Sequence, residues 1–215
     1  MCPPVRVHAV ACPRMGTVEV YADVACPFAH VLLSQLVQRR AELDATSIGI
    51  VVRAWPLELI DAVPHDPEQI VAEVRALQAS VAPELFRGFS TDRMPESTLP
   101  SMALTAAAYS RTPEAGEAVA LRLRELLFEE GVDISDPVVL GALEASHGLH
   151  VAPDVSVVEA EWDLGRHRGV KGSPHVFAGE MSEFCPTFTV GRTQHDYVVE
   201  PTPWASDFLT GCFRR

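Results

Sequence analysis

The sequence has little positive charge and no long hydrophobic run. Its 215 residues include 17 lysine and arginine residues against 29 aspartate and glutamate residues, which gives a formal charge of -12. An acidic surface disfavours nucleic acid and anionic membrane as partners. No stretch approaches the roughly 18 uninterrupted apolar residues of a membrane span, and the N-terminus lacks the apolar core of a signal peptide. We therefore expect a cytoplasmic protein with neither nucleic-acid nor membrane partners.

The chain also lacks paired cysteines at the spacing of a redox or zinc motif. It has no Cys-x-x-Cys pair and no Cys/His zinc spacing. The five cysteines are odd in number and irregularly spaced: Cys2, Cys12, Cys26, Cys185 and Cys212. Five histidines show no convergent spacing: His65, His147, His150, His167 and His195. We therefore expect no metal site and no disulfide framework, and instead free thiols in a reducing compartment.

The composition does supply enough apolar residues for a core. At 47% hydrophobic and 21% charged residues, it is typical of a globular protein. Residues 17–24 and 47–55 are apolar and β-branched, which predicts two buried strands. Between them, Pro27 opens a run whose apolar residues have near-helical spacing. The short connections predict a strand–helix–strand unit with parallel strands.

The middle of the chain, about residues 67–149, has helical periodicity and no strand pattern. We expect four helices there, the last capped by Asp136 and begun by Pro137. Strand patterns return at residues 175–179 and 187–191, and the short connection between them predicts a hairpin. Helices are expected on either side of this hairpin, at residues 155–169 and 201–213.

This order of elements is that of a thioredoxin fold with an insertion. We predict an α/β protein, thioredoxin-like, with an all-helical domain inserted after its second strand. The predicted thioredoxin-like domain comprises residues 15–60 and 151–215, and the inserted helical domain comprises residues 61–150. Residues 1–14 are expected to be a disordered tail or the product of a misassigned start codon.

The first predicted strand leads into half of a redox motif. Cys26, Pro27 and Phe28 are followed by Ala29, where a second cysteine would complete the motif. The unpaired N–H groups and the dipole at a helix start stabilise a thiolate, so we expect a lowered pKa at Cys26. His30 follows one turn later on the same side, where it could stabilise the thiolate or act as a base. A buried structural cysteine and a partly exposed histidine are the alternative interpretations.

Longer segments around this motif resemble one protein family. Between residues 17 and 178 the chain contains, in this order, VEVYADVACPF, VVRAWPLEL, LLFEEGVDISDPVVLGALEASHGL and GVKGSPHVF. These segments resemble the DsbA-like thioredoxin-fold family, and within it the cytoplasmic branch that includes the FrnE-type proteins. The 2-hydroxychromene-2-carboxylate isomerases and the kappa-class glutathione transferases are more distant members of the same group.

The resemblance implies an active site of two parts. One is Cys26 at the helix start, and the other is a cis-proline facing it, here Pro174. Ser173, which precedes the proline, is implied to offer its backbone to an extended substrate or a thiol. Asp23 matches a further family position, where it either tunes the local charge or caps the strand end. Together with the local motif, this predicts Asp23, Pro27, Phe28, Ser173 and Pro174 as substrate- or thiol-binding residues, and Cys26 and His30 as catalytic residues.

The departure from the family is Ala29, because members that shuttle disulfides have a second cysteine there. Without it, Cys26 can attack a disulfide but no neighbouring thiol can release the mixed disulfide. Cys12 precedes the first strand and Cys185 follows the strand that runs away from the site. We therefore expect both at the opposite end of the sheet from Cys26. The sequence does not determine which way Cys212 faces in the last helix.

These residues predict a DsbA-family thiol–disulfide oxidoreductase that works through a single cysteine. Cys26 would attack a disulfide or a thiol adduct, and a small thiol, glutathione or a functional equivalent, would resolve the mixed disulfide. No tightly bound cofactor is expected. The expected partner is a small-molecule thiol or disulfide, or a thiol-bearing protein.

Two other functions stay open at this point. One is a small-thiol-dependent isomerase or transferase of the 2-hydroxychromene-2-carboxylate isomerase or kappa type, with its substrate pocket between the domains. The other is a catalytically retired protein that binds a partner or ligand, because a fold does not fix a function. The sequence does not determine the oligomeric state and leaves a homodimer open.

Overall fold

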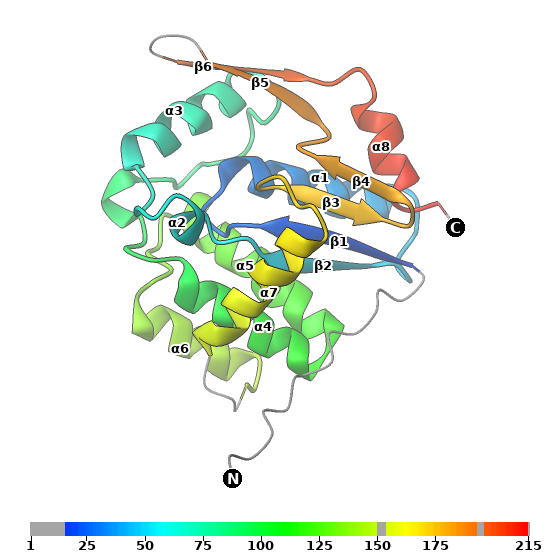
Figure 1. The fold of residues 1–215 in the computed structure, drawn as a ribbon. Helices are drawn as coiled ribbons and strands as arrows, with labels where there is room; N and C mark the ends of the chain where they lie inside the picture. The colour runs from blue at the N-terminus through cyan, green and yellow to red at the C-terminus, as the bar shows by residue number, and fades with distance from the viewer. Residues whose placement is uncertain (1–15, 150–153, 193–195, 215) are drawn as a thin grey trace.

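A four-stranded sheet forms the centre of the protein (Figure 1). The computed structural model describes residues 16–149, 154–192 and 196–214. The strands of the sheet have the order β2-β1-β3-β4. Their bounds are Thr17–Ala22 for β1, Gly49–Ala54 for β2, His175–Ala178 for β3 and Met181–Phe184 for β4. β1 is parallel to β2 and antiparallel to β3, which confirms the parallel strands of the predicted strand–helix–strand unit.

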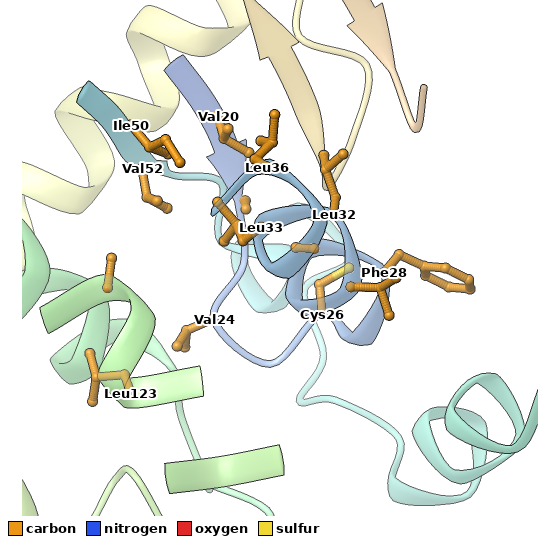
Figure 2. Close-up of a cluster of buried hydrophobic side chains, with 14 of the residues drawn as sticks. Val20, Val24, Cys26, Phe28, Leu32, Leu33, Leu36, Ile50, Val52 and Leu123 are labelled. Carbon is orange, nitrogen blue, oxygen red and sulfur yellow. The ribbon is translucent and has the colours of Figure 1, made fainter. Parts of the chain in front are cut away.

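One face of the sheet packs on α1 (Pro27–Glu42), which connects β1 to β2. Figure 2 shows leucine side chains of α1 in one buried cluster with valine and isoleucine side chains of β1 and β2. Side chains alternate between the two faces along a strand, so Val20 belongs to this cluster whereas Tyr21 belongs to a second one. The start of α1, which carries Cys26, is therefore fixed to the sheet by the core.

The other face packs on α7 (Val155–His167) through Tyr21 and Trp55. Gly165 permits this close approach. A Cβ atom at Gly165 would lie 2.8 Å from a ring carbon of Trp55 and 2.9 Å from one of Tyr21. The helix therefore rests on the aromatic rings, and its C-terminal end leads towards residues 170–174.

Every regular element between β2 and α7 is a helix in the described part of the chain, as predicted. The predicted cap is present, because the Asp136 side chain accepts a hydrogen bond from the Val138 N–H at 2.7 Å. None of the described helices is both long and apolar enough to cross a membrane. The elements are α2 (Leu57–Ile60), α3 (Pro67–Gln78), the 3-10 helix η1 (Thr91–Arg93), α4 (Leu99–Arg111), α5 (Pro113–Phe128) and α6 (Pro137–Ser146). The domain boundaries stay a prediction, and the predicted tail lies outside the described residues.

The predicted hairpin is wrong in its second strand. β3 pairs with β4, and the turn between them contains Gly179 at a φ of 59°, a conformation that glycine adopts readily. Residues 187–191 belong instead to β5 (Phe188–Arg192), which pairs with β6 (Tyr197–Pro201) in a separate two-stranded sheet. β4 was missed because its residues are mostly exposed and lack apolar alternation. The chain ends in α8 (Ala205–Gly211), which packs against α1.

Candidate active site

A cavity of about 750 Å³ opens at the start of α1. It lies between α1, the α2–α3 segment, the β4–β5 turn and the β5–β6 sheet. Four of the predicted site residues line it: Cys26, Pro27, Phe28 and Ser173. In Figure 2 the Phe28 ring points away from the strand side chains, and it contacts Phe188 of β5 with ring centroids 5.8 Å apart. The structure therefore places the Cys-Pro-Phe motif on the wall of a cavity.

Cys26 meets Ser173 although the two residues are far apart in sequence. Cys26 is the N-cap of α1, and Pro27 takes the first helical position. The Cys26 thiol donates to the Ser173 carbonyl oxygen at 3.4 Å. The Asp23 N–H donates to Ser173 Oγ at 3.0 Å, and the Ser173–Pro174 peptide bond is cis. The loop that precedes β3 is thus hydrogen-bonded to the loop that follows β1.

The surroundings of Cys26 raise the pKa of its thiol to about 12. Burial is the largest cause, because only 4% of the residue is exposed. Hydrogen bonds with Ser173 and with the Ala29 backbone lower the pKa, and the charges of Glu73 and Asp23 raise it. The predicted lowering is therefore wrong. The helix start does act in the expected direction, but burial and the two carboxylates outweigh it.

His30 faces the helical segment and does not line the cavity. Its Nε2 lies 2.8 Å from Glu129 Oε1. Its ring packs against Phe86 and Phe128, with centroid separations of 5.3 and 4.9 Å. The catalytic role of His30 stays a prediction. Helical spacing placed both residues on one side of α1, but their side chains meet different partners.

Asp23 holds the loop before α1 to two elements of the helical segment. It is fully buried. Its Oδ1 accepts a hydrogen bond from the Ala25 N–H at 2.9 Å, and its Oδ2 accepts one from the Leu57 N–H at 2.8 Å. The Thr98 hydroxyl also donates to Oδ2 at 3.4 Å. Asp23 therefore does both things that the sequence left open, since it fixes the strand end and places a negative charge close to Cys26.

His65 lines the cavity, and no sequence pattern pointed to it. Its Nε2 lies 3.3 Å from Asp23 Oδ2, which is an ion-pair distance without well-aligned hydrogen-bond geometry. Burial alone would lower the pKa of His65. The attraction of the nearby Asp23 carboxylate and the charges of Glu58 and Glu73 outweigh it, so the pKa is raised. His65 and Asp23 are brought together by tertiary structure alone.

Cys185 also lines the cavity, which corrects its predicted position at the far end of the sheet. Its N–H donates to the Pro174 carbonyl oxygen at 2.9 Å. The reason is the unpredicted strand β4, which runs antiparallel to β3 and returns the chain to the start of that strand. Burial, and after it the charge of Cys26, raise the pKa of the Cys185 thiol to about 12. Cys212 caps the end of α8 and is buried away from the lining residues.

The cavity combines apolar walls with negative charge. The described lining includes one histidine, His65, and neither lysine nor arginine. Its apolar side chains include Phe28, Ile70, Phe184, Phe188 and Trp204. Its carboxylates are Glu58, Asp61, Asp66, Glu73 and Glu183. Charges of one sign that line a cleft focus the field there, so the cavity disfavours anions.

No protein-family model and no curated protein matches the chain. Several solved structures do match it. The cytosolic disulfide reductase DsbM from Pseudomonas aeruginosa, solved with GSH, is 19% identical, with 78% of this chain and 88% of that chain covered and a TM-score of 0.50. A candidate protein disulfide isomerase from Nitrosomonas europaea is 14% identical, with coverages of 79% and 88% and a TM-score of 0.57. A 2-hydroxychromene-2-carboxylate isomerase is 15% identical, with coverages of 78% and 88% and a TM-score of 0.53.

These likenesses define the fold. The chain has a thioredoxin-like α/β fold similar to that of these structures, with helices between its second strand and α7. The fold class predicted from the sequence is therefore confirmed. The solved structures also include both a disulfide enzyme and a 2-hydroxychromene-2-carboxylate isomerase, the two kinds of protein that the sequence resemblance named.

The raised pKa gives a prediction for the reactivity of Cys26. A thiol with a pKa of about 12 is ionised in only about 1 in 10⁵ molecules at neutral pH. We therefore expect alkylation of Cys26, followed by peptide mapping, to be slow at pH 7 and to accelerate without a plateau up to pH 10. Replacing Glu73 by glutamine removes a charge that raises the pKa, so it should accelerate the reaction roughly two- to threefold.

The matched control is Glu183→Gln. Glu183 lines the same cavity but is exposed, so water screens its charge. We expect this variant to alkylate at the wild-type rate. A plateau below pH 9 in the wild type, or equal acceleration by the two variants, would contradict the electrostatic account of Cys26.

Proposed function

We propose that the protein is a thiol–disulfide exchange enzyme whose attacking group is Cys26. The observation that carries the proposal is the contact between the Cys26 thiol and the Ser173 carbonyl, 3.4 Å long, on the wall of an open cavity. A sulfur atom that enters the cavity meets Cys26 at the start of α1. The unpaired N–H groups there stabilise the negative charge that passes between sulfur atoms during exchange.

The high pKa of Cys26 favours the reducing direction. Strong disulfide oxidants owe their potential to a stabilised thiolate, whereas burial and two carboxylates destabilise the thiolate of Cys26. A thiolate of higher pKa is the better nucleophile, with a Brønsted coefficient of about 0.4–0.5, but its ionised fraction falls faster. The free protein should therefore react on the order of 100-fold more slowly than an ordinary cysteine at neutral pH. This low reactivity of the free Cys26 thiol suits an enzyme that reacts only with a bound substrate.

The second thiol of the reaction is proposed to be a small molecule of the reducing cytoplasm. Position 29 is a buried alanine, so the α1 motif supplies one cysteine. Cys26 attacks a disulfide R–S–S–R′, forms Cys26–S–S–R and releases R′SH, which takes the proton of Cys26. A small thiol then attacks the mixed disulfide, regenerates the Cys26 thiol and leaves as a disulfide. A thiol-bearing protein is the alternative source of the disulfide.

The charge of the cavity selects among small thiols. DsbM was solved with GSH, which makes glutathione the first candidate. Five carboxylates and one histidine are present in the described lining of the cavity, and together they repel an anionic ligand. We therefore propose that a neutral or cationic small thiol reacts in preference to glutathione.

A second function is favoured by the protonated state of Cys26. The likeness to a 2-hydroxychromene-2-carboxylate isomerase supports testing an isomerase or transferase that uses a small thiol as cofactor. In that case the start of α1 would hold the cofactor's thiolate, and Cys26 would be a hydrogen-bond donor with a pKa of about 12. Serine could replace Cys26 in this role, whereas it cannot attack a disulfide.

The test is the release of small thiol by a reference protein in which serine replaces Cys2 and Cys12, taken as the wild type here, and by its Cys26→Ser and control Cys212→Ser variants. Cystamine, hydroxyethyl disulfide and oxidised glutathione serve as cationic, neutral and anionic probes. We expect the wild type to react fastest with cystamine and slowest with oxidised glutathione. Cys26→Ser should lower the rate by on the order of 100-fold or more, and Cys212→Ser should leave it unchanged, because Cys212 is buried in α8 outside the cavity.

The other outcomes separate the alternatives. Equal rates in the wild type and Cys26→Ser would refute the exchange mechanism. Thiol-dependent isomerisation or transfer that survives in Cys26→Ser would support the second function. A protein that is inert in both assays would be a binding protein. A preference for oxidised glutathione over cystamine would refute the charge argument and leave the role of Cys26 intact.

A further inference from the structure

Two cysteines are hydrogen-bonded to one dipeptide, Ser173-Pro174. The Cys26 thiol donates to the Ser173 carbonyl at 3.4 Å, and the Cys185 N–H donates to the Pro174 carbonyl at 2.9 Å. Both cysteines line the same cavity. Of the three cysteines in the described residues, all of them free, Cys212 alone lies outside this cavity. The fold therefore provides Cys26 with a neighbouring cysteine from a different part of the chain.

The backbone conformation of the β4–β5 turn does not explain why residue 185 is a cysteine. It lies between β4 and β5 at a φ of 48°, in the left-handed region that favours glycine or asparagine. A cysteine there costs on the order of 1 kcal/mol relative to glycine, so the backbone alone does not favour it. Its side chain is also less deeply buried than that of Cys26 and lines the cavity. These features favour a function for the thiol itself.

We propose that Cys185 is the resolving thiol for Cys26, a role for which α1 has only Ala29. The inference rests on the proposed exchange function and deepens it. After Cys26 has attacked R–S–S–R′ and released R′SH, the Cys185 thiolate attacks Cys26 Sγ. The S–S bond to R breaks, a Cys26–Cys185 bond forms, and RSH leaves with the proton of Cys185. In total the two cysteines are oxidised to one disulfide and the substrate is reduced to two thiols.

The cycle closes with a low-molecular-weight thiol as the reductant. Two molecules of this thiol reduce the Cys26–Cys185 disulfide and leave as their own disulfide, so the small thiol of the proposed function is retained. The acceptor of the electrons is the substrate disulfide. Cys185 thus changes the stoichiometry of the first half-reaction from one released thiol to two.

The mobile partner in this step is expected to be Cys185. A disulfide requires Cα atoms roughly 4.4–6.8 Å apart. Cys26 is fixed by the core at the start of α1 and is 4% exposed. Cys185 lies in a turn between two sheets, and the structure gives its backbone one hydrogen bond, to Pro174. Any adjustment needed for bond formation therefore falls on the β4–β5 turn.

The test uses the full chain with Cys2 and Cys12 replaced by serine, which removes the other two thiols of the sequence and serves as the wild type here. This protein receives one equivalent of cystamine, followed by acid quenching and intact mass with peptide mapping. We expect the reduced wild type to release two thiols, lose two hydrogen atoms in mass, keep no adduct and yield a linked Cys26–Cys185 peptide. Cys185→Ala should release one thiol and keep one cysteamine on Cys26. Cys212→Ala is the matched control and should behave like the wild type, because Cys212 lies outside the cavity.

The outcomes distinguish this inference from the proposed function. A wild type that keeps the adduct on Cys26, as Cys185→Ala does, would overturn the role of Cys185 and leave exchange at Cys26 standing. A disulfide that links Cys26 to another cysteine would also overturn it. If neither protein reacts at Cys26, the proposed function fails first. Cys185→Ser provides a second, more conservative variant and should give the same result as Cys185→Ala.

Discussion

Replacing Asp23 by alanine is expected to lower the free energy of unfolding by about 3–5 kcal/mol, the range measured when one member of a buried charged network is removed. Asp23 is fully buried and accepts hydrogen bonds from the Ala25 and Leu57 N–H groups at 2.9 and 2.8 Å. Alanine leaves both donors unpaired, and each unpaired buried group costs about 1–3 kcal/mol. It also removes the countercharge of His65. Urea unfolding at neutral pH measures the effect.

Two further variants make the Asp23 prediction specific. Asp61 also lines the cavity but is exposed, so Asp61→Ala should change stability by less than about 0.5 kcal/mol. Asp23→Asn keeps the shape and removes the charge, and it serves if the alanine variant does not fold. It should be destabilised less than Asp23→Ala. It should also alkylate faster at Cys26, because the charge of Asp23 raises the pKa of that thiol. If Asp23→Ala were as stable as the wild type, the stabilising role of the Asp23 hydrogen bonds would be refuted.

The elements that the sequence predicted correctly carry strong local signals. β1, α1 and β2 follow from apolar, β-branched runs and from Pro27 at the first helical position. The cap at Asp136 is equally local, since its bond partner is two residues away. β4 has no such signal, because it is an exposed edge strand with polar residues. Missing it shifted the hairpin and moved Cys185 to the wrong end of the sheet.

The site was predicted only in part, for a related reason. Cys26 and Ser173 were found because a family resemblance linked them, and the structure brings them into contact. The contact between His30 and Glu129 was not predicted, because helical spacing says which residues share a face of α1 but not what that face meets. His65 and the burial of Cys26 depend on tertiary packing. A pKa follows from burial and neighbouring charges, and both were invisible in the sequence.

The second large effect is expected for Glu161→Ala, which should lower the free energy of unfolding by about 2–4 kcal/mol. Glu161 lies on α7 and is 7% exposed. Its Oε2 accepts a hydrogen bond from the Ala54 N–H and its Oε1 one from Arg53 Nη1, both at 2.8 Å. Alanine leaves the Ala54 donor unpaired in the core. Arg53 keeps Glu19 as a partner at 3.0 Å, so the loss should stay below the largest values for a broken buried pair.

Glu159→Ala is the control for this prediction, because Glu159 is on the same helix and exposed. It should remain within about 0.5 kcal/mol of the wild type, and equal losses in the two variants would contradict the role of the buried Glu161 contacts. The alkylation rate of Cys26 distinguishes a loss of the anchoring of α7 from a general loss of stability. α7 leads directly into the loop that carries Ser173. A Glu161→Ala protein that is still folded should therefore alter the alkylation rate of Cys26 more than that of Cys212, which is the C-cap of α8.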